Sequence, residues 1–311
     1  MTKPLQLQHP WLIAVWPGMG QVAIGAGYYL LTKLDMNLIA EFEAGELFDI
    51  DHVEVKNGLI QTGRRPRNRF FLWKDPNEKH DLVLFVGEAQ PPLGKYMFCR
   101  KLIDYAKELQ IERIITFAAM ATQMRPEQRS RVFAAATHAD YLGEVRQLEL
   151  EIIEDGHIGG LNGVLLGVAE EQGLHGLCLL GELPHIFSQL PYPKASFGIL
   201  EVFTAIAGIE LDFSELKEQA NHMDQQLSEL LAKMEESMGR PPGLEEESYL
   251  QESVAEEEKI PPAAKLKIES LFEEAAKDRK KAFELKRELD KLGVFKEYED
   301  RFLDLFKKSE G

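Results

Sequence analysis

The residues that could do chemistry in this chain begin with a glycine-rich stretch, WPGMGQVAIGAGYYL, at positions 16–30. Gly18 and Gly20 open a match to the pattern G-x-G-x-x-G/A directly behind an apolar run. In a dinucleotide-binding fold these glycines let the backbone approach a pyrophosphate at a helix N-terminus. Such a site also needs a third parallel strand, and the sequence predicts an antiparallel excursion after the second strand instead. We therefore expect a tight strand-to-helix turn and no bound cofactor.

A second candidate is the loop at residues 87–92, which lies between an apolar run and a helical pattern. Loops at the carboxyl ends of strands line ligand crevices in α/β sheets. Glu88 could act there as a general acid or base, and Gln90 could donate a hydrogen bond to a ligand. We favour the alternative, in which both side chains cap backbone groups at the strand end or face a partner subunit.

A third candidate is the stretch GELPHIFSQLPYP at residues 181–193. Glu182, His185 and Ser188 have the residue types of a hydrolase site, but Ser188 lacks the G-x-S-x-G turn that exposes a nucleophile. Glu182 and His185 have no further metal ligands nearby in sequence. We predict no catalytic residue and no metal site here, and interpret the prolines as a rigid loop over a pocket or interface. The candidate pocket or interface residues are Gly18, Gly20, Glu88, Gln90, Gly181, Glu182 and His185.

Composition restricts the classes of function. The chain has 311 residues, 44% of them apolar, and a formal net charge of −16. This charge argues against nucleic acid and anionic membranes as partners, since both require positive potential. Two cysteines far apart in sequence favour a reducing compartment. The first residues do not resemble a signal peptide, and no stretch is long enough to span a membrane. We expect a cytoplasmic protein.

Alternating apolar runs and helical patterns in the first 210 residues predict an α/β fold with a mixed or parallel sheet. The predicted strands are residues 11–16, 38–42, 82–87, 113–117 and 174–180, and the predicted helices are 22–33, 94–109, 161–171 and 195–207. Residues 52–73 interrupt this alternation. Asn57-Gly58 between alternating residues predicts a β-hairpin, because both turn positions require positive φ.

The C-terminal third differs in composition. Residues 213–238 have a helical pattern, and residues 238–262 form an acidic segment rich in proline and glutamate that we interpret as a linker. A charged amphipathic helix is predicted from Pro261-Pro262 to Gly293, followed by a short helix at 295–306. Its apolar stripe must be buried on the core, on a sister subunit or on another protein. We divide the chain into an α/β domain (1–237), this linker (238–262) and a C-terminal helical extension (263–311).

Four motifs in order resemble the PAC2 family, which includes proteasome assembly chaperones. They are WPGMGQVAIGAGYYL, GEAQPP, GGLNGVLLGVAEEQGLHGLCLLGELP and PYPKASFGILEVFTAIAGIELDFSEL, and the resemblance extends from about residue 11 to residue 220. It implies a three-layer α/β/α domain with a mixed sheet of the purine nucleoside phosphorylase-like kind. It also implies a homo-oligomer, trimeric or larger, that binds proteins. Archaeal relatives that engage the proteasome carry a C-terminal hydrophobic-Tyr-x tail, whereas Glu310 occupies the tyrosine position here.

The leading hypothesis is therefore a non-enzymatic, assembly chaperone-like or scaffolding protein, with a further protein partner possible through the C-terminal helices. The alternative is a protein or enzyme that binds a nucleoside- or phosphate-type molecule with the strand-end loops. This alternative is based on the fold implied by the resemblance, and a fold by itself does not determine function.

Overall fold

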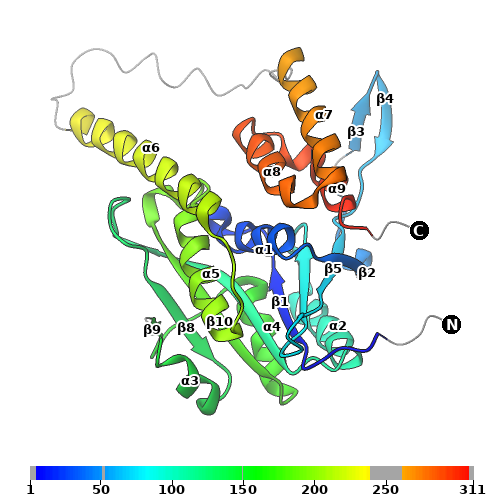
Figure 1. Cartoon of the computed structure of the whole chain (residues 1–311), viewed down its shortest axis with the longest axis vertical. Helices are drawn as coiled ribbons and strands as arrows, with labels where there is room; N and C mark the ends of the chain where they lie inside the picture. The colour runs from blue at the N-terminus through cyan, green and yellow to red at the C-terminus, as the bar shows by residue number, and fades with distance from the viewer. Residues whose placement is uncertain (1–4, 51–52, 149, 239–260, 308–311) are drawn as a thin grey trace.

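The computed structural model describes residues 5–50, 53–148, 150–238 and 261–307, which are built around an eight-stranded mixed sheet (Figure 1). Strands β6, β1, β7 and β10 are parallel to one another, whereas β5 is antiparallel to both of its neighbours and β8 is antiparallel to β10. In sheet order the strands are β2 (Asn37–Glu41), β5 (Asn68–Trp73), β6 (Leu82–Gly87), β1 (Trp11–Val15), β7 (Arg113–Thr122), β10 (His175–Pro184), β8 (Val132–Ala136) and β9 (Glu151–Ile152).

The apolar strands form the middle layer because both of their faces are covered. In β1, Trp11, Ile13 and Val15 belong to one hydrophobic cluster, and Leu12 and Ala14 belong to the other. Alternate side chains of a strand point to opposite faces, so a continuous apolar run requires helices on both sides. The first cluster packs against α1 (Val22–Lys33), α5 (Pro193–Ala207) and α6 (Ser214–Met238), and the second against α2 (Lys95–Glu108) and α4 (Gly160–Glu171). The predicted three-layer α/β/α fold is confirmed.

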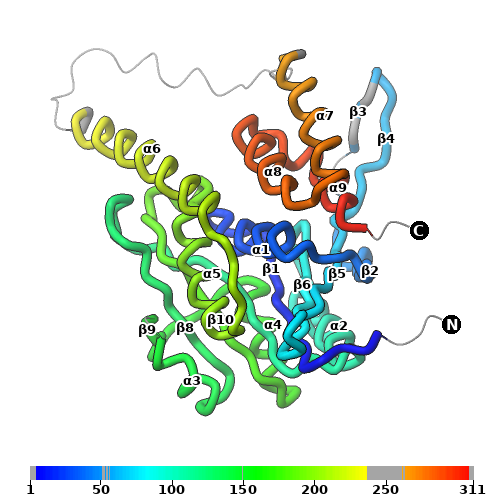
Figure 2. Tube along the Cα trace, in the orientation of Figure 1, coloured from blue at the N-terminus to red at the C-terminus, as the bar shows by residue number. Residues whose placement is uncertain are grey.

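The hairpin predicted from Asn57-Gly58 is confirmed. Asn57 has φ +52° and Gly58 has φ +77°, and they join β3 (Val53–Lys56) to β4 (Leu59–Thr62). These two strands form a separate sheet, which we call the ribbon. Figure 2 shows the ribbon extending away from the main sheet. After it the chain returns as β5, which pairs antiparallel with both β2 and β6, so β2 does not lead into a second parallel strand through a helix.

The predicted single C-terminal helix is wrong, because the structure has two helices there. These are α7 (Pro262–Lys277) and α8 (Ala282–Lys291), and α9 (Phe295–Asp304) follows. Asp278 has extended backbone, and its side chain accepts a hydrogen bond from the amide of Lys280, so it caps a new 3-10 turn. Gly293 has φ +69° and terminates α8 as expected.

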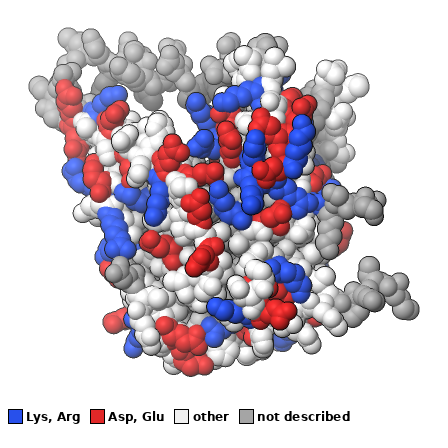
Figure 3. Space-filling view, viewed as in Figure 1, with Lys and Arg blue, Asp and Glu red and all other residues white. Residues whose placement is uncertain are grey.

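The apolar stripe of the C-terminal helices is buried on the chain's own core. The Tyr29 ring meets Phe283 edge-on with centroids 4.7 Å apart, and the Tyr28 hydroxyl donates to Glu299 at 2.5 Å. The Leu38 amide of edge strand β2 donates to the Phe306 carbonyl at 2.8 Å. The three helices therefore cover α1 and one edge of the main sheet. Their outward surface carries interleaved acidic and basic side chains (Figure 3).

Two differences from the expected elements affect the candidate site. The strands β8 and β9 and the short helix α3 (Ala139–Val145) were not predicted. Strand β10 continues to Pro184, so Gly181 and Glu182 lie inside a strand and not in a loop; they pair with Ala119 and Met120 of β7. The predicted linker, residues 238–262, lies outside the described residues except at its ends.

Candidate functional site

The Gly18–Gly20 turn packs against the loop that precedes α5. Gly20 has φ +59°, and its amide donates to the Ser188 carbonyl at 2.7 Å while its carbonyl accepts from the Tyr192 amide at 2.8 Å. A Cβ atom at Gly20 would lie 2.6 Å from the Leu183 side chain. The amide that a phosphate would need is thus engaged in holding the loop before α5. This geometry supports our interpretation of the glycines as a tight turn.

Gly18 and Gln90 do meet, at a hollow of about 490 Å³ beside the carboxyl ends of the parallel strands, which we call the strand-end hollow. The Gln90 amide nitrogen donates to the Pro17 carbonyl at 3.3 Å, and its oxygen accepts from the Leu161 amide at 3.1 Å. Gln90 therefore links the β1–α1 turn to the start of α4. The other lining residues are Met19, Ala23, Ala118, Ala119, Met120, Ala121, His157, Ile158, Gly159, Asn162 and Leu180. The hollow's one side chain of a general acid–base type among these described lining residues is His157.

Glu88 does not line this hollow. It is buried, and it accepts hydrogen bonds from the Arg69 and Arg64 guanidinium groups at 2.8 Å each and from the Arg67 amide at 2.9 Å. All three arginines also pair with Asp300 of α9. We call these five residues the arginine cluster. Arg69 of β5 pairs with both Asp300 of α9 and Glu88, so the cluster attaches α9 to the main sheet and Glu88 has a structural role.

Burial and charge act in opposite directions on Asp300. Burial favours the neutral acid and tends to raise the pKa of Asp300, but the hydrogen bond and charge of Arg69, together with Arg64 and Arg67, outweigh it. The pKa of Asp300 is therefore held below its ordinary value. The carboxylate remains charged at neutral pH and holds the C-terminal helices against the sheet.

Glu182 belongs to a different group of contacts near the ends of β7 and β10. It is buried, and it accepts from the Thr122 hydroxyl at 2.7 Å and from two guanidinium nitrogens of Arg131 at 2.6 and 2.8 Å. Burial tends to raise the pKa of Glu182, but the hydrogen bonds from Arg131 and Thr122 outweigh this effect. The pKa of Glu182 is therefore lower than its ordinary value. His185 is exposed, with its Nδ1 3.2 Å from the Thr122 carbonyl. Gly181 packs against Ala195, whose carbonyl oxygen would lie 2.6 Å from a Cβ there.

The seven candidate residues thus do not form one site. Gly18 and Gln90 share the strand-end hollow, Glu88 belongs to the arginine cluster, and Glu182 and His185 lie around Thr122. Gly20 and Gly181 allow close packing. The alternative hypothesis of a small-molecule site would bring the three strand-end loops to one crevice, whereas here arginine side chains hold Glu88 and Glu182 in two separate groups of contacts.

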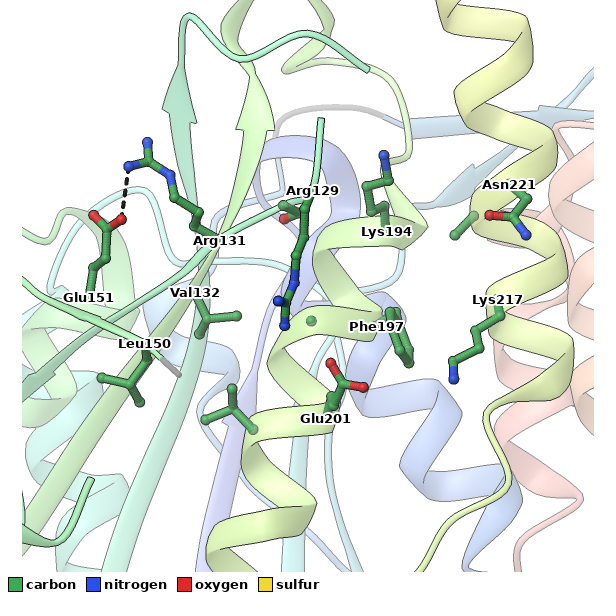
Figure 4. Close-up of a pocket in the computed structure, with 14 residues that line it drawn as sticks. Arg129, Arg131, Val132, Leu150, Glu151, Lys194, Phe197, Glu201, Lys217 and Asn221 are labelled. Carbon is green, nitrogen blue, oxygen red and sulfur yellow. Dashed lines mark hydrogen bonds and ion pairs between the residues drawn. The ribbon is translucent and has the colours of Figure 1, made fainter. Parts of the chain in front are cut away.

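A hollow that the sequence analysis missed lies between β8, α5 and α6 (Figure 4). It measures about 470 Å³, and we call it the α5–α6 hollow. Its apolar surface comes from Val132, Leu150, Phe197, Gly198, Val202 and Ala220, and its charged residues are Arg129, Arg131, Glu151, Lys194, Glu201 and Lys217. An apolar floor with a charged rim is typical of protein contact surfaces. The apolar run at residues 132–136 was the available signal, but its strand was not predicted.

The rim charges are largely held by neighbouring groups. Arg131 pairs with Glu151 at 2.9 Å, as Figure 4 shows, and Lys194 pairs with Asp224 at 2.6 Å. The Lys217 ammonium lies 5.0 Å from the centre of the Phe197 ring. These contacts hold four of the six charged side chains that line the hollow.

Within residues 5–50, 53–148, 150–238 and 261–307, no three His, Cys, Asp or Glu side chains are grouped to hold a metal ion. None of the helices in those ranges is both long and apolar enough to cross a membrane.

Comparison with known proteins supplies a family. The model of the PAC2 family matches residues 12–231. An uncharacterised protein of Methanocaldococcus jannaschii is 26% identical over 256 residues, covering 78% of this chain and 93% of that protein. The crystal structure of Pyrococcus furiosus PbaB, an archaeal proteasome activator, aligns with a TM-score of 0.61 and 28% identity over 74% of this chain and 95% of PbaB.

A proteasome-assembly chaperone homologue of Mycobacterium tuberculosis aligns with a TM-score of 0.62 and 21% identity, covering 72% of this chain and 96% of that one. At this identity the likeness concerns the fold. The family match ends within α6, so α7, α8 and α9 lie outside it.

Proposed function

This chain belongs to the PAC2 family, and from that membership we propose that it is a non-enzymatic, homo-oligomeric protein-binding factor of the assembly-chaperone type. The observation that carries the proposal is the likeness to PbaB, an archaeal proteasome activator, over nearly the whole of that protein. We further propose that it works in the cytoplasm and that its partners are proteasome subunits or their assembly intermediates.

The α5–α6 hollow is our candidate for the partner contact. Its apolar floor is accessible, and its rim carries four cationic and two acidic side chains in a chain of net charge −16. A partner with an apolar anchor next to carboxylates fits this arrangement, since the rim pairs charges while the floor buries the anchor.

The experiment is capture of partners by the full-length chain from its own cells, followed by native mass spectrometry. Proteasome subunits at defined stoichiometry, lost with Phe197→Glu and retained with Leu266→Glu on α7, are the expected result. Leu266 is exposed and lies far from the hollow in sequence. Failure to retain any proteasome component would contradict the proposed partner, and equal capture by both variants would exclude the hollow as its contact.

In this proposal the C-terminal helices do not bind a partner through their apolar stripe, which was one of the uses that the sequence left open. Their apolar stripe packs on α1, so a partner would meet their outer surface, which carries charged side chains and the exposed Leu266. Removing residues 239–311 would expose Tyr28, Tyr29 and Phe71, all of which are buried. We therefore expect this truncation to destabilise the core, and a point substitution such as Leu266→Glu is the better test of recruitment.

A second candidate function is binding of a small nucleoside- or phosphate-type molecule in the strand-end hollow. The observation that favours it is the volume of about 490 Å³, which suits a small ligand, at the strand ends where α/β folds bind ligands. Thermal shift measurements with nucleosides and inorganic phosphate test it, using Ala119→Phe to fill the hollow. A shift in melting temperature that the variant abolishes supports this candidate, and no shift with any ligand removes its basis.

A further inference from the structure

The ribbon is a separate two-stranded sheet that exposes apolar side chains to solvent. Val53, Val55, Leu59 and Ile60 are between 52% and 75% exposed. Val55 lies opposite Ile60, and Val53 lies opposite Thr62. Facing residues of paired strands share one side of the sheet, so Val53, Val55 and Ile60 form one apolar face. Isolated two-stranded hairpins are marginally stable in water, so this face needs a covering surface.

The ribbon also has open strand edges. Its strands pair with each other and with no other strand of the described residues. The main sheet is protected by comparison, because the Phe306 carbonyl of the C-terminal segment accepts from the Leu38 amide of edge strand β2, and the opposite edge strand β9 has two residues. Unpaired amides and carbonyls on an exposed strand are a template for another strand.

The four residues of β4 are all uncharged. Charged residues on an edge strand discourage strand addition. The β4 edge is therefore suited to pairing with another strand.

The surface that fits this edge is a second copy of the same ribbon. Two copies of a chain of net charge −16 repel each other, so a contact between them favours an uncharged element that extends from the body. The β4 strand and the Asn57-Gly58 turn meet this requirement. An isologous contact uses the same patch on both copies, and a face of Val53, Val55 and Ile60 is complementary to itself.

We propose that β4 of one copy pairs antiparallel with β4 of a second copy about a two-fold axis. The resulting four-stranded sheet shares one apolar face and satisfies the open backbone groups of both β4 edges. A pairing centred on Ile60 keeps the apolar residues on one face and places Ile60 opposite its counterpart in the partner. This inference rests on the self-association included in the proposed function, and it names the contact.

A contact through a four-residue strand is small compared with the roughly 800 Å² per partner of a stable complex. The expected association is accordingly concentration-dependent, with a dissociation constant in the micromolar range. A two-fold contact forms dimers by itself, and a second interface would combine such dimers into larger closed assemblies.

The experiment is sedimentation velocity of the full-length protein over a concentration series, comparing the wild type with Ile60→Lys and Leu266→Lys. Leu266 is the matched control because it is 74% exposed, close to the 75% of Ile60. We expect Ile60→Lys to weaken self-association at least tenfold, since the two-fold axis introduces two charges at once. Leu266→Lys should leave it unchanged.

Cysteine cross-linking gives a second measurement that does not depend on weakening the contact. Ile60→Cys should form covalent dimers on mild oxidation, and Leu266→Cys should not. The natural thiols do not interfere, because burial raises the pKa of both Cys99 and Cys178 to about 12.

Each outcome distinguishes this inference from the proposed function. Unchanged self-association in Ile60→Lys, together with equal cross-linking at positions 60 and 266, overturns the ribbon contact and leaves a homo-oligomer formed by another surface. A wild type that stays monomeric at all concentrations overturns both the ribbon contact and the homo-oligomer, while capture of proteasome subunits remains an independent result.

Discussion

The arginine cluster and the ribbon are neighbours in the chain, and they distribute polarity in opposite ways. The cluster buries charge: Arg69 and Glu88 are almost inaccessible to solvent and pair at 2.8 Å. The ribbon exposes apolar groups, with Ile60 three-quarters exposed. Buried charges and exposed apolar patches are the informative exceptions to the usual distribution. In the cluster, α9 of the same chain supplies the covering contact through Asp300, and the ribbon has no covering element among the described residues.

The two regions are expected to affect different properties of the protein, the stability of the fold and its self-association. Ion pairs in the cluster keep the C-terminal helices on the core, so changes there should reduce the stability of the fold. Substitutions on the ribbon should leave the stability of one chain unchanged and alter only association. The predictions below test this contrast, from the largest expected effect to the smallest.

The largest effect is expected for Arg69→Ala. This substitution leaves the buried Glu88 carboxylate without its buried guanidinium partner and removes a partner of Asp300. Removing one member of a buried ion pair costs about 3–5 kcal/mol. Urea unfolding measures the loss. Lys101→Ala is the control, because Lys101 and Glu46 form an exposed pair whose loss should cost less than about 1 kcal/mol. Equal losses in both variants would contradict a structural role for the cluster.

A smaller effect is expected for Asp300→Asn. It removes the charge that α9 presents to Arg64, Arg67 and Arg69 while keeping the shape of the side chain. We expect a loss of about 1–2 kcal/mol, reduced because Asp300 is about one-third exposed. Hydrogen exchange should rise in residues 261–307 more than in β1 and β7. Uniformly increased exchange over the whole chain would show that the cluster does not specifically retain the helices.

The same variant makes a prediction about pH. The pKa of Asp300 is lowered in the folded protein, so its ion pairs stabilise the fold above the unfolded-state pKa of about 3.9. This contribution is lost as the pH falls through the folded-state pKa. The difference in unfolding free energy between wild type and Asp300→Asn should therefore be constant from about pH 7 to pH 5 and shrink in stronger acid. If the difference in unfolding free energy grew on acidification, the pKa of Asp300 would be raised in the folded protein and not lowered.

The smallest effect on stability is expected for Ile60→Lys. An exposed side chain on the ribbon contributes little to the folding of one chain, so the unfolding free energy should change by no more than about 0.5 kcal/mol. Urea unfolding at low protein concentration, where association is negligible, is the measurement. A loss comparable with that of Arg69→Ala would remove the contrast between the two regions.

Much of the fold follows from local patterns in the sequence. The apolar run at Trp11–Val15 required burial on both faces, and Asn57-Gly58 specified the hairpin. Such features depend on residues close together in the chain, so they can be interpreted directly. The break at Asp278 was missed because a helical stripe continues across it, and a single capping carboxylate determined the boundary. Strand β8 was missed because three of its five residues are alanine, which is depleted in strands, and β9 was missed because it has only two residues.

The sequence by itself determined the α/β class, the family motifs and the presence of a charged C-terminal extension with an apolar stripe. Tertiary structure alone decided which strand-end residues meet. Glu88 and Gln90 are only two residues apart in the chain, but the tertiary structure places them in different sites. Three arginines donate to the Glu88 carboxylate and also pair with Asp300, so Glu88 belongs to the arginine cluster. The tertiary structure also placed the C-terminal stripe on α1. Local patterns fix how each segment folds, whereas contacts between distant segments depend on shapes and charges that form only after packing.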